Sequence, residues 1–199
     1  MTDPSFGRDI ERSLVLETYI DHWGMPQTRR LAGNDVDAIE LYRFPASAQT
    51  GWVDRLATVG VSEPIAAGDA CSDRELMFAW LPDSSNHPLR SIQDVALDVA
   101  AYLRDKRIRE DGFVIQALRN PVPLAATMML IDEPLTEKDT LKTIALNGEI
   151  VNIAWVVPVF PNEAEWIRLH GMASFDQLRE QSSQNLFRLD RRSMIDTVA

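Results

Sequence analysis

Residues Thr143–Phe160 read TIALNGEIVNIAWVVPVF and carry the clearest structural signal in the chain. The dipeptide Asn147-Gly148 favours a tight turn, because both residues tolerate the positive φ angles that two-residue hairpin turns need. The residues on either side are rich in β-branched and aromatic side chains, which favours strands. We therefore predict two antiparallel strands, near Thr143–Leu146 and Val151–Phe160.

Other elements are predicted outward from this hairpin. Apolar residues recur at helical spacing in two longer segments, Arg8–Trp23 and Ser91–Lys106. Ser91 with Asp94, Asn162 with Glu165 and Ser174 with Gln177 match helix capping patterns, so we expect helices to begin at Ser91, Asn162 and Ser174. Apolar and β-branched runs predict five further strands, at Ala38–Phe44, Trp52–Val61, Glu75–Leu81, Phe113–Ala117 and Thr127–Ile131.

The order of these elements indicates the fold class. Strands and helices do not alternate regularly, which argues against Rossmann and barrel folds. Short connections between neighbouring strands favour antiparallel or mixed pairing. There is no repeat, low-complexity tract or obvious linker, so we expect one domain over residues 1–199. The prediction is an α+β fold in which helices pack against a mixed β-sheet, like an α/β sandwich.

The composition is that of an ordinary globular protein. Apolar residues make up 45% of the chain and charged residues 25%, which excludes disordered and collagen-like classes. No apolar run approaches the ~20 residues that a membrane helix needs. Met1–Arg12 is polar and charged, unlike a signal peptide, and the lone Cys71 cannot form an internal disulfide. We therefore expect a cytoplasmic protein that does not associate with membranes.

The charge balance points to a protein partner. The chain has 20 basic and 30 acidic residues, a net charge of −10, which argues against nucleic-acid binding. Residues 1–99 carry 8 basic and 16 acidic residues, and the remainder carries 12 and 14. An acidic half of this kind can steer a basic protein toward it, although acidic residues also serve solubility alone.

Sequence signatures of catalysis and of cofactor binding are missing. The chain contains no G-x-G-x-x-G, P-loop or G-x-S-x-G motif. Its histidines, His22, His87 and His170, fall in separate elements without the spacing of metal ligands. Asp69 and Asp73 flank Cys71 and disfavour a reactive thiolate. We predict no catalytic residue, no cofactor and no metal.

Two acidic clusters and one tryptophan are the best candidates for a binding surface. The clusters are Asp35/Asp37/Glu40 and Asp69/Asp73/Glu75, and neither has the spacing of a calcium loop. Trp80 and Trp155 lie inside strand runs and are expected in the core, whereas Trp23, Trp52 and Trp166 lie near element ends. Because exposed tryptophan is common at protein interfaces, the predicted interface is Asp35, Asp37, Trp52, Asp69 and Asp73.

Several segments in order resemble the suppressor-of-fused domain. The helix Ser91–Lys106 and seven further segments carry the resemblance. The seven are WVDRLATVGVSEP (Trp52–Pro64), DRELMFAWLP (Asp73–Pro82), GFVIQALRNPVP (Gly112–Pro123), MLIDEPLT (Met129–Thr136), IAWVVPV (Ile153–Val159), NEAEWIRLHG (Asn162–Gly171) and LDRRSMID (Leu189–Asp196). Where family members often have a Gly-His pair, this chain has Gly112-Phe113. The role of that histidine is therefore absent, and Phe113 is interpreted as a packing residue.

The resemblance implies a sandwich-like domain that binds proteins and is not an enzyme. It places a family-like core at about 36–195 behind a helical N-terminal extension at about 1–25. The animal family member binds a transcription factor, and compact bacterial members, which this chain resembles, look like immunity proteins that neutralise a cognate toxin. We therefore expect an immunity-type protein that is a monomer or weak dimer and whose partner is a toxin domain, many of which are basic. Two alternatives are a scaffold subunit that self-associates and a small carboxylate-dependent enzyme.

Overall fold

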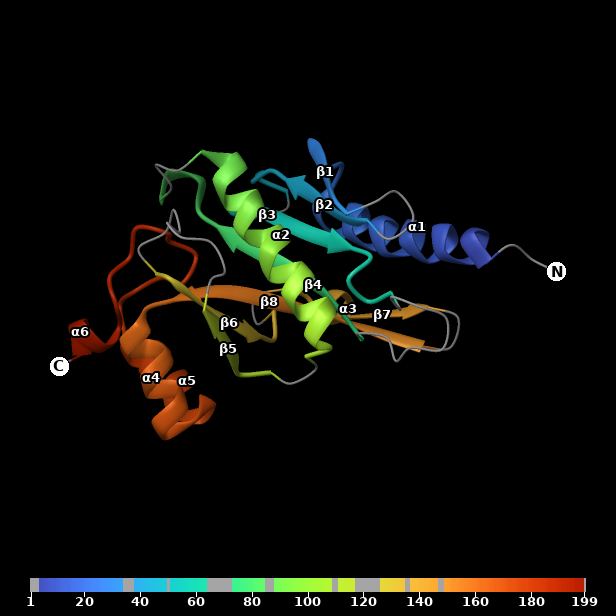
Figure 1. Cartoon of the computed structure of the whole chain (residues 1–199). Coiled ribbons are helices and arrows are strands. Elements are labelled where there is room, and N and C mark those ends of the chain that lie inside the picture. The colour runs from blue at the N-terminus through green and yellow to red at the C-terminus, as the bar shows by residue number, and fades with distance from the viewer. Residues whose placement is uncertain are drawn as a thin grey trace.

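A mixed β-sheet of eight strands forms the centre of the molecule, in the order β1-β2-β3-β4-β8-β6-β5, with β7 also paired to β8 (Figure 1). The computed structural model describes residues 4–33, 38–49, 51–63, 73–84, 88–108, 111–116, 126–134, 137–146 and 149–198. The strands are β1 Thr28–Ala32, β2 Ile39–Phe44, β3 Asp54–Val59, β4 Arg74–Trp80, β5 Phe113–Gln116, β6 Met128–Asp132, β7 Thr143–Leu146 and β8 Glu149–Val159. Only β4 and β8 pair in parallel among them.

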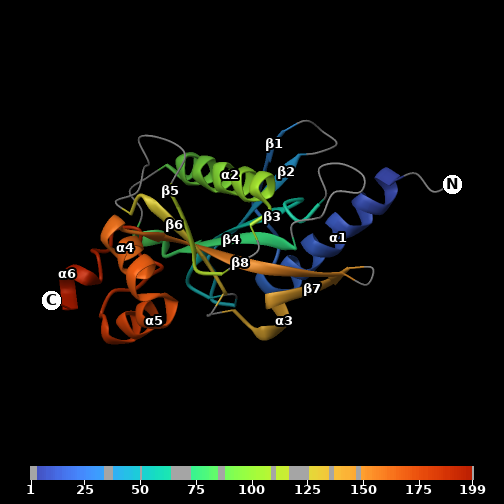
Figure 2. The same ribbon diagram turned by 60° about the horizontal axis from the view of Figure 1, so that its bottom comes forward.

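Helices cover both faces of the sheet. These are α1 Pro4–Trp23, α2 Leu89–Lys106, α3 Asp139–Lys142, α4 Pro161–His170, α5 Met172–Gln181 and the short α6 Ile195–Val198, with a 3-10 turn η1 at Pro82–Ser84. The apolar face of α2 packs on one side of the sheet, whereas α1, α3, α4 and α5 contribute to a second core on the other (Figure 2). The predicted α+β sandwich is confirmed.

The hairpin expected from Asn147-Gly148 forms between β7 and β8. Leu146 pairs with Glu149 and Ile144 with Val151, so two residues connect the strands, and these two lie outside the described residues. Beyond the hairpin β8 continues with alternate side chains in each core. Its Trp155 is buried and stacks on Phe187 at 5.0 Å between ring centroids.

The N-terminal helix is an integral part of the second core. Tyr19 stacks on Trp23 at 5.0 Å, and both rings meet Phe44 of β2 edge-on. Arg12 binds Glu63 through two nitrogens, at 2.5 and 2.6 Å, and Glu40 of β2 at 3.2 Å. These contacts fix α1 against β2 and the residues that follow β3.

The predicted helix starts at Ser91, Asn162 and Ser174 are wrong. The helix α4 begins at Pro161 after Phe160, and Glu163, not Glu165, accepts from the Phe160 amide. The helix α2 begins at Leu89 after Pro88 and has no side-chain cap. The helix α5 begins at Met172 after Gly171, and the Ser174 hydroxyl accepts a hydrogen bond from Trp166 Nε1 at 3.1 Å. None of the described helices has the length and apolar character needed to cross a membrane.

Candidate protein-interaction site

The described residues of the predicted interface do not form one patch. Trp52 precedes β3 and is 74% exposed, whereas Asp73 is half-buried just before β4. Because Asp54 pairs with Trp80, Trp52 and Asp73 stand at opposite ends of the β3–β4 pair, roughly 30 Å apart at the usual rise of a strand. Asp35, Asp37 and Asp69 lie outside the described residues.

The acidic clusters expected from the sequence are partly taken up in internal contacts. Glu40 binds Arg12 through Oε1 and Arg29 through Oε2, and Oε2 also accepts a hydrogen bond from the Tyr42 hydroxyl. Asp73 Oδ1 lies 3.8 Å from Arg74 Nε.

Glu75 is buried and accepts hydrogen bonds from the Thr58 hydroxyl and from three donors in Gly60 and Ser62. Burial raises the pKa of the Glu75 carboxyl, and the hydrogen bonds from Thr58, Ser62 and Gly60 partly oppose that rise. Glu75 therefore holds the chain that follows β3 and does not face a partner.

No metal site is found in the described ranges, where His, Cys, Asp and Glu do not gather in groups of three able to hold an ion. Both described histidines have structural contacts. His22 lies within hydrogen-bond distance of the Thr18 carbonyl and the Thr140 hydroxyl, at 2.8 and 2.9 Å. His170 packs on Trp166 at 4.2 Å between ring centroids. His87 and Cys71 lie outside the described residues.

The two edges of the sheet differ in character. The edge strand β1 reads TRRLA, and its Arg29 and Arg30 form ion pairs with Glu40 and Asp94. Charged side chains on an edge strand discourage pairing with another chain. The opposite edge strand β5 reads FVIQ and carries no charge. It pairs with β6 on one side, and no described strand pairs with its other side.

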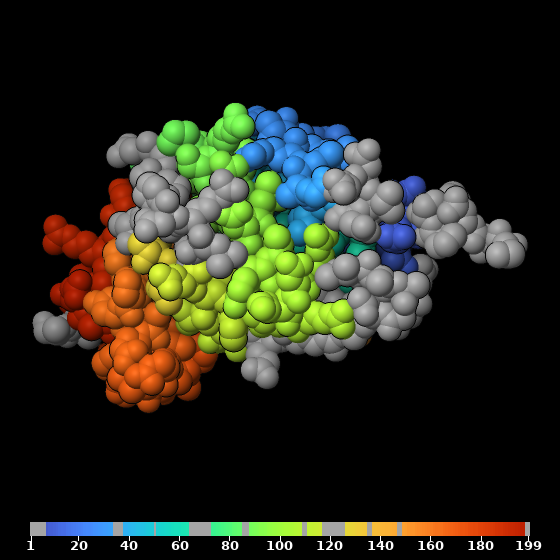
Figure 3. Space-filling view, viewed as in Figure 1, coloured from blue at the N-terminus to red at the C-terminus, as the bar shows by residue number. Residues whose placement is uncertain are grey.

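An apolar groove runs beside β5. It has a volume of about 350 Å³ and lies between the β5–β6 hairpin and α4. Its apolar lining comes mainly from Val114, Met128, Pro161, Ala164 and Ile167, and Glu165 and Arg168 also line it. Figure 3 shows β5, in yellow-green, and α4, in orange, next to each other on this face of the molecule. A groove beside an edge strand can accept an extended segment that joins the sheet.

A second cavity, the acidic channel, adjoins the apolar groove at Gly112. It has a volume of about 740 Å³, and both cavities share Gly112. Besides Gly112 and Met172, its lining has five carboxylates and one arginine, namely Asp111, Asp132, Glu133, Asp176, Glu180 and Arg179. Arg179 Nη1 lies 3.0 Å from Asp132 Oδ2 and 3.1 Å from Asp176 Oδ1. Asp111 Oδ1 lies 2.7 Å from Arg74 Nη1. With Glu133 and Glu180 the lining keeps an excess of negative charge, which favours basic side chains.

Burial is the largest influence on the pKa of Asp132, which lines the channel. It raises the pKa of the Asp132 carboxyl, although the hydrogen bond from the Glu133 amide and the charge of Arg179 act in the opposite direction. The Arg179–Asp132 pair also ties α5 to the end of β6.

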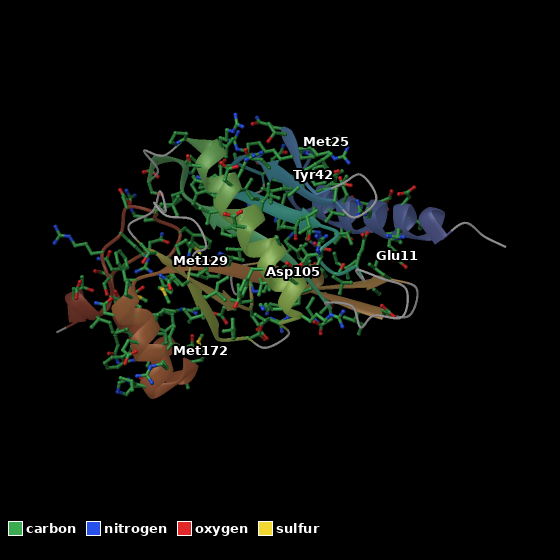
Figure 4. The ribbon with its side chains drawn as sticks, viewed as in Figure 1. Glu11, Met25, Tyr42, Asp105, Met129 and Met172 are labelled. Carbon is green, nitrogen blue, oxygen red and sulfur yellow. The ribbon has the colours of Figure 1, made fainter. Side chains whose placement is uncertain are left out.

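Gly112 is the junction between the two cavities. Its φ angle is +73°, a conformation that favours glycine, and its amide donates to the Ile131 carbonyl at 2.8 Å. It also lies against the first residue of α5, Met172, which Figure 4 labels. Sequence reasoning missed this channel, because its acidic residues come from three distant segments, at 111, at 132–133 and at 176–180.

Comparisons with known proteins identify the family. The sequence model of the Suppressor of fused protein (SUFU) family matches residues 35–192. A search of curated proteins found no match. The fold matches a chain of the Sufu-Fu complex crystal structure with a TM-score of 0.65 and 13% identity, over 96% of this chain and 93% of that one.

Drosophila Suppressor of Fused has the same fold. The TM-score is 0.60 at 13% identity, over 94% of this chain. The match covers 50% of the Drosophila chain, so this protein spans about half of that relative. The family model covers most of the sequence and the fold agrees along nearly the whole chain. The protein therefore belongs to the Suppressor of fused family.

Proposed function

We propose that this protein is a non-catalytic binding module that captures and neutralises a basic toxin domain, as a cytoplasmic immunity protein does. The observation that carries the proposal is the outer edge of β5, which is uncharged and pairs with no described strand, beside an apolar groove that adjoins an acidic channel. A solved relative in the same fold class is Sufu in a complex with Fu. That precedent supports a protein partner, and the net charge of −10 favours a basic one.

The geometry suggests how such a partner would dock. An extended segment of the partner would pair with β5 through main-chain hydrogen bonds, and its apolar side chains would enter the groove lined by Val114 and Ile167. Its lysine or arginine side chains would reach the channel past Gly112. Charge attraction would speed encounter, and the buried apolar contacts would slow dissociation.

The test is co-expression with the toxin domain of any large secreted protein encoded beside this gene. We expect host survival and a co-purifying complex in a one-to-one ratio. Val114→Glu places a charge in the groove and is expected to weaken the complex at least tenfold. Leu31→Glu on the opposite, arginine-bearing edge is the control, because it adds the same charge to an edge strand at the exposed Leu31.

The surface predicted from the sequence gives a competing interface for the same test. If Trp52→Ala and Asp73→Lys abolish capture while Val114→Glu leaves it intact, the interface lies on that surface and the β5 groove is the wrong site. Loss of self-association in Val114→Glu, with no toxin capture in the wild type, would instead favour a scaffold that pairs through β5. A monomer in sedimentation experiments contradicts that scaffold.

A further inference from the structure

The ion pair between Glu163 and Arg191 is the most enclosed charge contact among the described residues. Their side chains are 0% and 2% exposed. Arg191 donates from both terminal nitrogens to the two carboxylate oxygens, at 2.6 and 2.7 Å. Its guanidinium also donates to the Pro158 carbonyl and lies over the Phe160 ring. The carboxylate is saturated further by the backbone amides of Phe160 and Met194.

These contacts join three parts of the chain at one point. Pro158 belongs to the end of β8, and Phe160 and Glu163 are the N-cap and a first-turn residue of α4. Arg191 belongs to the C-terminal tail. A second layer reinforces the junction, because Ser193 donates to Asn162 at 2.9 Å. The N-terminal end of α4 is thus fixed in position and direction by the tail.

The helix that is fixed in this way is one wall of the apolar groove. Pro161, Ala164 and Ile167 of α4 line the groove opposite β5. At the far end of α4 the chain turns at Gly171 into α5, whose first residue, Met172, lies against Gly112 at the root of β5. The distance between α4 and β5 is therefore held at both ends, by the buried ion pair and by the Met172–Gly112 contact.

We infer that Glu163 and Arg191 are positioning residues for the groove, which set its width without touching the partner. This inference rests on the proposed docking at β5. A buried ion pair is not the most stable way to fill such a space, because apolar residues of similar volume often serve as well. A bidentate pair does fix direction, which a purely apolar contact does not.

The test distinguishes an effect of the ion pair on the position of α4 from its effect on the stability of the whole fold. Arg191→Met alone leaves the Glu163 charge buried without its partner, so it is expected to destabilise the fold. The double variant Glu163→Gln/Arg191→Met removes both charges, and the glutamine oxygen can still accept from the Phe160 or Met194 amide. We therefore expect it to recover most of the loss in the urea midpoint. If the pair positions α4, amide exchange in residues 161–170 of the double variant rises at least tenfold while β3 and β4 stay protected. Unchanged exchange in α4 would overturn the inference, whether or not a partner domain has been found.

The second part of the test measures the affinity for the toxin domain captured in the co-expression experiment. We expect the double variant to bind it about tenfold more weakly than wild type at an equal urea midpoint. Full affinity of the double variant, with loss in Val114→Glu, would refute positioning and leave docking at β5 intact. Full affinity of both variants would refute docking at β5 itself. If the double variant does not fold, Arg191→Lys replaces it. Lysine keeps the positive charge but cannot make the two-point contact with Glu163, and amide exchange in α4 is measured in the same way.

Discussion

A β-carbon added at Gly112 would come within 2.5 Å of Met172 Cγ. Gly112 also has a φ angle of +73°, so any other L-residue there is strained both by its backbone and by its neighbour. We predict that Gly112→Ala lowers the free energy of unfolding by more than about 1 kcal/mol, as measured by urea denaturation. Combining it with Met172→Ala should recover part of the loss, because the clash is shared between the two positions.

Gly7 provides the matched control for that substitution. It lies within α1, and no atom comes within 4 Å of a β-carbon added there. Gly7→Ala should leave stability unchanged or raise it by about 0.5–1 kcal/mol, because alanine favours helix over glycine. A similar loss in both variants would show that Met172 does not constrain Gly112.

Replacement of Glu75 by glutamine should stabilise the protein at neutral pH. Burial raises the pKa of Glu75 in the folded state above its unfolded value. The folded state then holds the proton more tightly, so stability is greatest below the unfolded pKa and falls as pH rises through the folded pKa. Glu75→Gln should remove that fall, because the neutral amide still accepts from Gly60 and Ser62. The Thr58 hydroxyl can turn to the Leu76 carbonyl.

The measurement is urea denaturation of both proteins between pH 4 and pH 8. The advantage of Glu75→Gln should grow with pH and then level off. Glu75→Ala is the control, because it leaves the same backbone donors buried without an acceptor and should be destabilised at every pH. A variant Glu75→Gln that is equally destabilised at every pH would mean that the charge of Glu75 favours folding.

The loss of Glu137 should destabilise the packing of α1. Its carboxylate accepts from Trp23 Nε1 at 3.0 Å and from Arg55 Nε at 2.9 Å, and the side chains of Glu137 and Arg55 are largely buried. Glu137→Ala leaves Arg55 without this partner, which typically costs about 3–5 kcal/mol at a buried pair. We expect a lower midpoint in thermal unfolding and a change in tryptophan fluorescence. Glu165→Ala, which breaks an exposed pair with Arg168, should change little.

Partner capture should depend on the charge of the channel more than on the charge of the whole protein. Asp176→Lys/Glu180→Lys is expected to lower the association rate roughly tenfold at low salt. Glu17→Lys/Asp21→Lys changes the net charge equally on exposed positions of α1. Stopped-flow measurements at two salt concentrations compare the association rates of the two double variants. Equal effects of the two double variants would place the steering charge outside the channel.

Local periodicity accounts for the elements that were predicted. The β7–β8 hairpin follows from the turn preference of Asn147-Gly148, and the long helix α2 from its apolar stripe. The strand β1 was missed, because TRRLA is polar and largely exposed and is held by pairing with β2. Trp23 lies at a helix end, as expected, yet it is only 3% exposed, because Tyr19, Phe44 and Glu137 surround it.

The candidate site was less accessible to sequence reasoning than the fold. The acidic patterns at residues 35–40 and 69–75 attract attention as clusters, but Glu40 and Glu75 serve internal contacts. The channel depends on Asp111, Asp132 and Glu180, which only the tertiary structure brings together. One local signal was available, since Gly112 stands between a polar turn and an uncharged strand and belongs to a segment that resembles the family.

The contrast between the two edges of the sheet has a consequence for how this protein must be produced. Arginines protect β1, while β5 presents an uncharged backbone edge that any extended chain can match. If the partner docks at β5 as proposed, we expect unwanted aggregation to begin at the same strand. Synthesis in step with the partner would keep that strand occupied. Overproduction of the protein alone should yield inclusion bodies that co-synthesis of the partner prevents.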